Sequence, residues 1–79
     1  GGAGQKSALF DEEAALKVGS LVRFLGEPYL GSTGSVVELP ERPERLPSGI
    51  IARVAVVERQ EGSLIRVPVT NILLLDANP

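Results

Sequence analysis

Residues 18–39 read VGSLVRFLGEPYLGSTGSVVEL, and this stretch places a glycine-rich turn between two apolar runs. In the first run Val22 and Phe24 alternate with Arg23, which is the period of two that predicts a half-buried strand. The second run, residues 34–39, is rich in β-branched side chains and predicts another strand. The segment between the two runs therefore predicts a turn that allows the neighbouring strands to pair.

The turn residues have separate physical roles. Pro28 fixes its own φ and so presets a turn position, while Gly31 permits a positive φ that other residues rarely adopt. Gly34 allows a close backbone approach or a bulge where the second strand begins. These properties indicate a tight turn between strands, and they are not specific for any ligand.

Two phosphate-binding or RNA-binding motifs resemble parts of the same stretch and are excluded. The six residues from Gly26 to Gly31 match half of a P-loop, but no lysine follows them and the next element is a strand instead of a helix. The GSTG of residues 31–34 matches the GXXG loop of KH domains. That loop joins two helices and usually carries basic residues, which this one lacks.

The whole stretch resembles the KOW motif, the signature of an SH3-like barrel module in NusG-type transcription elongation factors and several ribosomal proteins. The matching positions are Val18, Gly19, Val22, Gly26, Pro28, Tyr29, Gly31, Gly34 and Val36. The resemblance implies a small five-stranded barrel and a contact with nucleic acid or a ribonucleoprotein. However, Leu30, Ser32 and Thr33 occupy loop positions where nucleic-acid-binding members commonly carry Lys or Arg, and phosphate contacts need those charges.

The rest of the chain supplies the remaining strands. Residues 50–58 and 64–69 alternate like strands, a turn containing Gly62 joins them, and residues 70–76 give a turn and a short last strand. Pro68 removes a hydrogen-bond donor and predicts either an edge position or the end of the strand. Five short strands at this spacing favour a mainly β fold, a small closed SH3-like barrel that leaves no open edge.

The N-terminal part predicts a short helical segment before the barrel, with an ordered loop as the alternative. Asp11 is a suitable N-cap, and Gly19 a suitable stop, for a helix of one or two turns. Residues 1–10 are expected to be a flexible tail, and residues 11–77 a single domain. The start at Gly-Gly, without an initiator methionine, suggests a domain excised from a longer protein.

Composition excludes several classes of function. The chain has 79 residues, a net charge of −2, and neither cysteine nor histidine. The common Ser-His-Asp and Cys-His catalytic sites are therefore absent, as are cysteine and histidine ligands for zinc. No apolar run reaches the roughly 18 residues of a membrane span. We expect a non-catalytic cytoplasmic domain that needs no cofactor or metal and does not contact a membrane.

Three surfaces are candidates for binding. Arg23, Arg53 and Arg66 are predicted to point outward from three strands, either as one anion-binding face or as a solvated face balanced by acidic residues. The ten-residue loop 40–49, which contains Arg42 and Arg45, is either a docking segment or a simple connector. Tyr29, at the turn tip, either anchors a partner or folds over the end of the core.

These observations lead to two functional hypotheses. The first is a protein-interaction or structural module whose partner is another protein or another domain of the parent chain, which the slight acidity and the lysine-free glycine loop favour. The alternative is a KOW-type module that contacts RNA or DNA. An enzyme is the least supported class.

Overall fold

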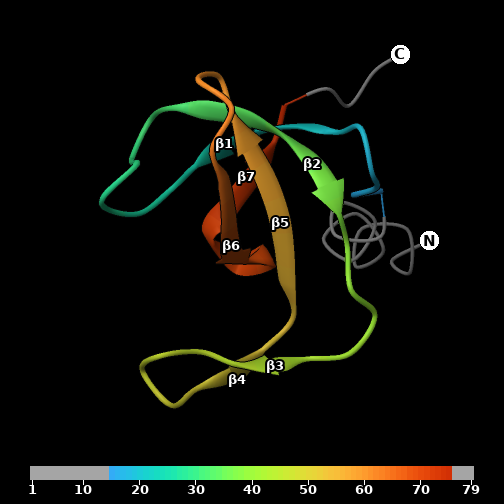
Figure 1. Ribbon diagram of the computed structural model, residues 1–79, viewed down its shortest axis with the longest axis vertical. Helices are drawn as coiled ribbons and strands as arrows, with labels where there is room; N and C mark the ends of the chain where they lie inside the picture. Colours follow the sequence, from blue (N-terminus) through green and yellow to red (C-terminus); the bar gives the residue numbers. More distant parts are fainter. Residues whose placement is uncertain (1–14, 76–79) are drawn as a thin grey trace, which may run out of the picture.

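The computed structural model describes residues 15–75, which form a mainly β structure dominated by one antiparallel sheet (Figure 1). The elements in chain order are β1 (Leu21–Phe24), β2 (Thr33–Glu38), β3 (Glu44–Arg45), β4 (Ile51–Ala52), β5 (Val54–Arg59), β6 (Leu64–Pro68), the 3₁₀ turn η1 (Val69–Asn71) and β7 (Ile72–Leu74). The predicted tail, residues 1–10, lies outside the described residues, as do the two ends of the predicted domain.

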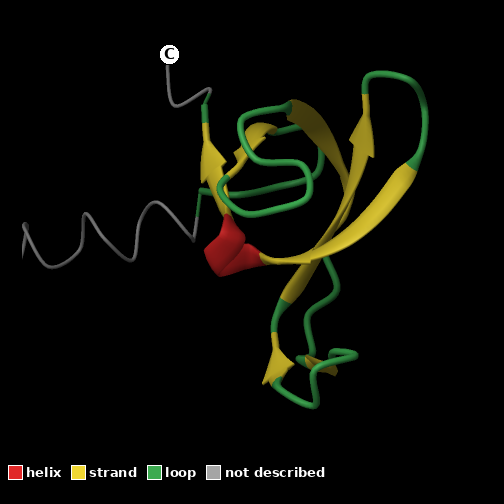
Figure 2. Ribbon diagram, turned by 90° about the vertical axis from the view of Figure 1, so that its left-hand side faces the viewer, coloured by secondary structure: helices red, strands yellow, loops and turns green. Residues whose placement is uncertain are grey.

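The five-stranded sheet has the order β6-β5-β2-β1-β7, so the last strand returns beside the first. Figure 2 shows that the sheet curls strongly around its concave side. The expected mainly β fold of five main strands is confirmed, but the sheet is not closed into a barrel, because β6 and β7 are its two edges and no strand pairing joins them within residues 15–75. The short η1 turn connects these edges instead, and Pro68 is on an edge strand as predicted.

The core fills the concave side, and the predicted alternation in β1 is confirmed. Val22 and Phe24 are buried, whereas Arg23 between them is exposed. The core cluster also takes residues from the other four strands and from the N-terminal turn: Leu16, Val36, Ala55, Val57, Val67 and Ile72. Burial of this set is the main favourable contribution to folding for a chain without disulfides.

Gly34 allows β2 and β5 to pair closely, as the sequence predicted. A β-carbon at Gly34 would lie 2.6 Å from the Glu58 carbonyl oxygen and 2.6 Å from Val57 Cγ1. The predicted positive φ at Gly31 is also present, at +85°. A bulge does occur in β2, but it lies between Val36 and Glu38 and not at Gly34.

The predicted third strand, residues 50–58, is wrong as a continuous element. It is broken at Arg53 into β4 and β5, which belong to different sheets. Before β5 the chain runs outside the main sheet, where β4 pairs with β3 as a small two-stranded ribbon. We call residues 40–53 the arm, because Figure 1 shows this ribbon projecting from one end of the sheet.

The N-terminal helical segment is not seen in the described residues. Residues 11–14 of that prediction are outside them, and residues 15–20 form a turn in which the Ser20 amide donates to the Lys17 carbonyl at 2.9 Å. Gly19 has a φ of +99°, so it ends a turn here and not a helix. The carboxylates placed at the predicted helix start lie outside the described residues.

Candidate functional site

The glycine loop, residues 25–32, is tied at both ends to the sheet. The Phe24 amide donates to the Ser32 carbonyl at 2.8 Å, and the Gly31 amide donates to the Phe24 carbonyl at 2.9 Å. The Leu25 amide donates to the Asn71 carbonyl of η1 at 2.9 Å. These bonds give the loop a defined position beside the end of β6.

Gly26 sets how closely this loop approaches η1. A β-carbon at Gly26 would lie 2.7 Å from Asn71 Nδ2 and 2.9 Å from Asn71 Oδ1. The missing side chain therefore leaves space for the Asn71 amide. Sequence analysis treated Gly26 as a turn residue, but its partner in η1 could be identified only from the fold.

Tyr29 folds over one end of the core, which was one of the two interpretations of this residue. It is half-buried, and its ring centroid is 5.6 Å from that of Phe24 with an interplanar angle of 50°. The Arg59 guanidinium lies over the Tyr29 ring, with its central carbon 4.2 Å from the ring centroid. This is a cation–π contact, and it fixes the side of Tyr29 that faces β5.

Arg59 is a site residue that the sequence analysis missed. The third strand was predicted to end at Glu58, so Arg59 was assigned to the turn that follows. The signal was nevertheless present, because continuing the alternation from Ala55 and Val57 puts residue 59 on the core face. The strand in fact extends to Arg59.

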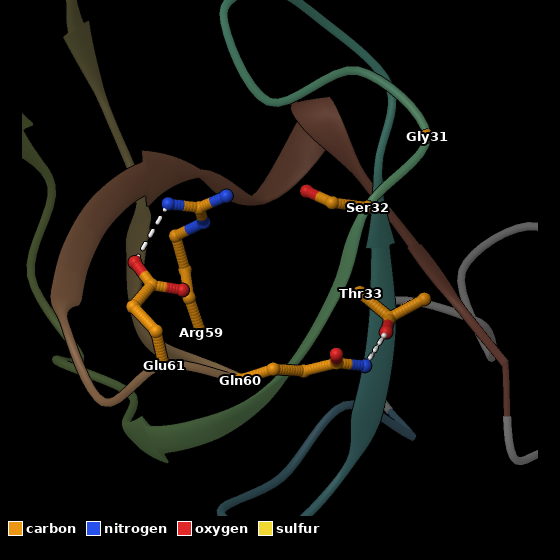
Figure 3. A pocket seen from close by; sticks show the side chains of 6 residues that line it. All are labelled: Gly31, Ser32, Thr33, Arg59, Gln60 and Glu61. Carbon is orange, nitrogen blue, oxygen red and sulfur yellow. Dashed lines mark hydrogen bonds and ion pairs between the residues drawn. The ribbon is translucent and has the colours of Figure 1, made fainter.

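Two hollows lie beside the loop, and the first is polar. It has a volume of about 310 Å³ and is lined by Gly31, Ser32, Thr33, Arg59, Gln60 and Glu61 (Figure 3). Arg59 Nη1 is 2.8 Å from Glu61 Oε2, and Gln60 Nε2 donates to Thr33 Oγ1 at 3.1 Å. Arg59 Nε is buried and has no hydrogen-bond partner among the described residues. The Ser63 hydroxyl donates to Glu61 Oε2 at 2.6 Å and is the main cause of the lowered pKa of that carboxyl.

The second hollow, which we call the groove, runs between the glycine loop and β6. Its volume is about 240 Å³, and it is lined by Phe24, Gly26, Glu27, Pro28 and Tyr29 on one side and by Ile65, Arg66, Val67, Pro68 and Asn71 on the other. The lining combines aromatic, aliphatic and proline side chains with a few polar groups. This mixture is typical of ligand sites, and the groove is our candidate functional site.

The three predicted outward arginines do not form one patch. Arg23 is on β1 and Arg66 is on β6, and two strands, β2 and β5, lie between them. Neighbouring strands are about 4.8 Å apart, so these two positions are roughly 14 Å apart across the sheet. Arg23 is exposed and makes no ion pair with any residue in the range 15–75.

Arg66 instead holds the arm to the sheet, and Arg53 joins the two ends of the arm. Arg66 donates to both carboxylate oxygens of Glu44, from Nε at 3.1 Å and from Nη2 at 2.9 Å. Arg53 Nη2 donates to the Pro40 carbonyl oxygen at 3.1 Å. Two residues predicted as anion binders and the predicted docking loop are thus parts of one structural unit.

The Glu44–Arg66 ion pair also shifts the pKa of both side chains. The hydrogen bonds from Arg66 lower the pKa of the Glu44 carboxyl, and the same bonds raise the pKa of the Arg66 guanidinium. Arg42 and Arg45, the two remaining arginines of the arm, are exposed, and neither has an ion-pair partner within the described range.

Other kinds of site receive no support from the part of the chain that the structure describes. Residues 15–75 contain no group of three or more Asp or Glu side chains suited to a metal ion. No helix within the same range is long and apolar enough to cross a membrane.

Comparisons with known proteins found no matching family model, no matching curated protein and no matching solved structure. The resemblance to the KOW motif therefore stays a prediction from the residues of the glycine loop and its flanking strands.

Proposed function

We propose that this chain is a non-catalytic binding module that recognises a segment of another protein, or of another domain of its parent chain, in the groove. The single observation that carries the proposal is the groove itself, a cavity of about 240 Å³ with a largely apolar lining beside an edge strand. The polar hollow is a weaker candidate, because Arg59 is paired with Glu61 and Gln60 donates to Thr33.

The curled sheet supports assignment to the SH3-like barrel class that the KOW resemblance implies. The last strand lies beside the first, a 3₁₀ turn precedes it, and the sheet bends around a single core. In this proposal β6 and β7 are the two edges of an incompletely closed barrel. The groove then lies at the opening, where the glycine loop covers part of the concave side.

A selection from a random peptide phage-display library tests the proposal. We expect the 79-residue chain to enrich peptides that bind it in solution, and we expect Tyr29→Ala and Glu27→Lys to weaken that binding. Leu30→Ala is the matched control, because Leu30 is exposed in the same loop but does not line the groove. Failure to enrich any peptide, or equal loss of binding in the control, would contradict a peptide-binding groove.

Nucleic-acid binding is the second candidate, and the exposed Arg23, Arg42 and Arg45 are the observation that favours it. Glu41 and Glu44 alternate with the arginines of the arm, which reduces the local positive charge. A titration with single-stranded RNA and duplex DNA decides between the two candidates. Binding at about 50 mM salt that weakens steeply as salt rises would favour this alternative, and no binding would exclude it for this chain.

A further inference from the structure

The groove follows the edge of β6 and not one of its faces. Its lining includes Ile65, Arg66, Val67 and Pro68 in succession. Because side chains alternate between the two faces of a strand, a cavity that touches four consecutive residues must run along the backbone edge. The groove is therefore bordered on one side by the main chain of β6.

The hydrogen-bond register shows which backbone groups of β6 face this edge. The Arg59 amide donates to the Ser63 carbonyl at 2.8 Å, and the Val69 amide donates to the Arg53 carbonyl at 3.0 Å. In an antiparallel ladder, hydrogen-bonded and non-hydrogen-bonded pairs alternate. With the pairing of β5 and β6, Ile65 and Val67 therefore bond to β5, whereas Leu64 and Arg66 point their amides and carbonyls away from it.

The outward backbone groups have no partner within the described residues. β6 pairs only with β5, and no turn or loop bond in this range involves the amide of Leu64 or Arg66. Pro68 has no amide hydrogen, so it adds a carbonyl but no donor at the end of the row. An open strand edge of this kind is a template for pairing with another extended chain.

The charge of the groove limits which extended chain fits. Arg66 is already neutralised by two hydrogen bonds from its guanidinium to Glu44. Glu27 lines the groove and makes no ion pair with any residue described by the structure. The unpaired charge of the groove is therefore negative, which favours a basic side chain in the partner.

We propose that the partner segment binds as an added β-strand along the edge of β6, with a basic residue directed at Glu27. This inference rests on the proposed peptide-binding function and specifies its mode. Alternate side chains of the added strand would point into the groove. One of them is an apolar residue that packs between Tyr29 and Ile65, and the next residue on the same face is the lysine or arginine that approaches Glu27.

Amide hydrogen exchange of the 79-residue chain, with and without the most enriched phage-display peptide, tests the binding mode. We expect the amides of Leu64 and Arg66 to become at least about tenfold slower to exchange when the peptide is saturating, because they gain hydrogen bonds. Ile65 and Val67 are internal controls, since they already bond to β5. A bound peptide that leaves Leu64 and Arg66 unprotected would overturn strand addition while leaving the proposed peptide binding intact.

N-methyl scanning of the same peptide gives an independent readout that is insensitive to protein folding. Strand addition requires that methylation of every second peptide amide abolishes binding, whereas methylation of the intervening amides is tolerated. A tolerance pattern with a period of three would indicate a polyproline-type mode instead. If no peptide is enriched at all, the proposed function and this inference both fail, which separates that outcome from failure of the mode alone.

The preference for a basic residue in the partner is tested with a separate variant. Glu27→Gln should weaken binding of a lysine-containing or arginine-containing peptide by about two- to fivefold and flatten its salt dependence. Enriched peptides without a basic residue would contradict the preference. Protection of Leu64 and Arg66 that rises with protein concentration alone would assign the edge to a second copy of this chain and overturn the choice of partner.

Discussion

The sheet and the arm are both antiparallel β-structure, yet they are stabilised in different ways. β5 is an interior strand of the sheet, between β6 and β2, and four of its six residues, Val54 to Val57, are buried. The arm ribbon has two strands of two residues each, and the adjacent Ile50 and Ile51 are both 61% exposed. A two-stranded ribbon with no buried face is at best marginally stable by itself.

The difference shows that apolar side chains organise the sheet, whereas polar contacts to neighbouring elements position the arm. The arm is attached through Arg66 on β6, which donates to Glu44, and through the Arg53 carbonyl, which accepts from the Val69 amide. These contacts fix the direction in which the arm projects, but they add little to the free energy of unfolding, because exposed ion pairs contribute little to stability. Changes in the sheet should therefore alter global unfolding, and changes in the arm should alter local order.

The largest effect is expected at Gly34. Gly34→Ala would place a methyl group 2.6 Å from the Glu58 carbonyl oxygen, and β2 and β5 would have to separate. We expect a loss of about 3 kcal/mol in the free energy of unfolding, measured by urea denaturation. A domain of this size has a total stability of only about 5 kcal/mol, so the variant should stay folded in water but unfold at a much lower urea concentration.

Gly31→Ala is the matched control for this substitution. Gly31 has a φ of +85°, but a β-carbon there would meet no atom within 4 Å. The cost is then conformational only, at about 1 kcal/mol. Equal destabilisation by the two substitutions would contradict the close approach between β2 and β5.

A medium effect is expected from matched truncations in the two regions. Val57→Ala removes two methyl groups from a fully buried side chain, and we expect a loss of about 2 kcal/mol from lost burial and the remaining cavity. Ile51→Ala removes more carbon from the arm but should change stability by less than about 0.5 kcal/mol, because the side chain is exposed. A large loss in the arm variant would show that the arm is part of the cooperative core.

The smallest effect on global stability is expected at the attachment of the arm. Glu44→Gln removes the carboxylate that accepts two hydrogen bonds from Arg66, so the amides of β3 and β4 should exchange faster while the urea midpoint hardly moves. Glu41→Gln is the control, because Glu41 is exposed and has no ion-pair partner in the described part of the chain. Unchanged exchange in the Glu44 variant would show that the ion pair does not position the arm.

The same attachment should depend on pH in a defined direction. Because Arg66 lowers the pKa of Glu44 in the folded chain, the stabilisation is complete above the usual carboxyl pKa of about 4.3. It is lost as the pH falls through the lower pKa of the folded state. NMR shifts of the β3 and β4 amides should follow this titration in the native chain and lose it in the Glu44→Gln variant.

Much of the sheet was predictable from local pattern. The alternation of Val22 and Phe24 identified the buried face of β1, and the glycines at positions 31 and 34 identified the turn and the close strand contact. Pro68 identified an edge strand. In each case the reason is that a residue's own backbone preference, or the period of two in a strand, acts over a few neighbouring positions.

The candidate site was predictable only in part. The sequence identified Gly26, Pro28 and Tyr29 as turn residues, but the opposite wall of the groove comes from β6, about 40 residues further along the chain. It did not identify the partners of Arg53 and Arg66, because Pro40 and Glu44 are not close to them in the sequence. Hydrogen bonds over such separations depend on where the strands are placed.

The sequence alone therefore determined the composition of the β-structure, the glycine turn and the absence of histidine and cysteine chemistry. The tertiary structure decided which strands became edges, where the arm is attached and which wall faces Tyr29. The physical reason is that strand pairing is a non-local interaction between backbones that have the same hydrogen-bonding groups at every position. Side-chain pattern fixes the buried face of each strand, whereas the order of strands depends on how all of them share one core.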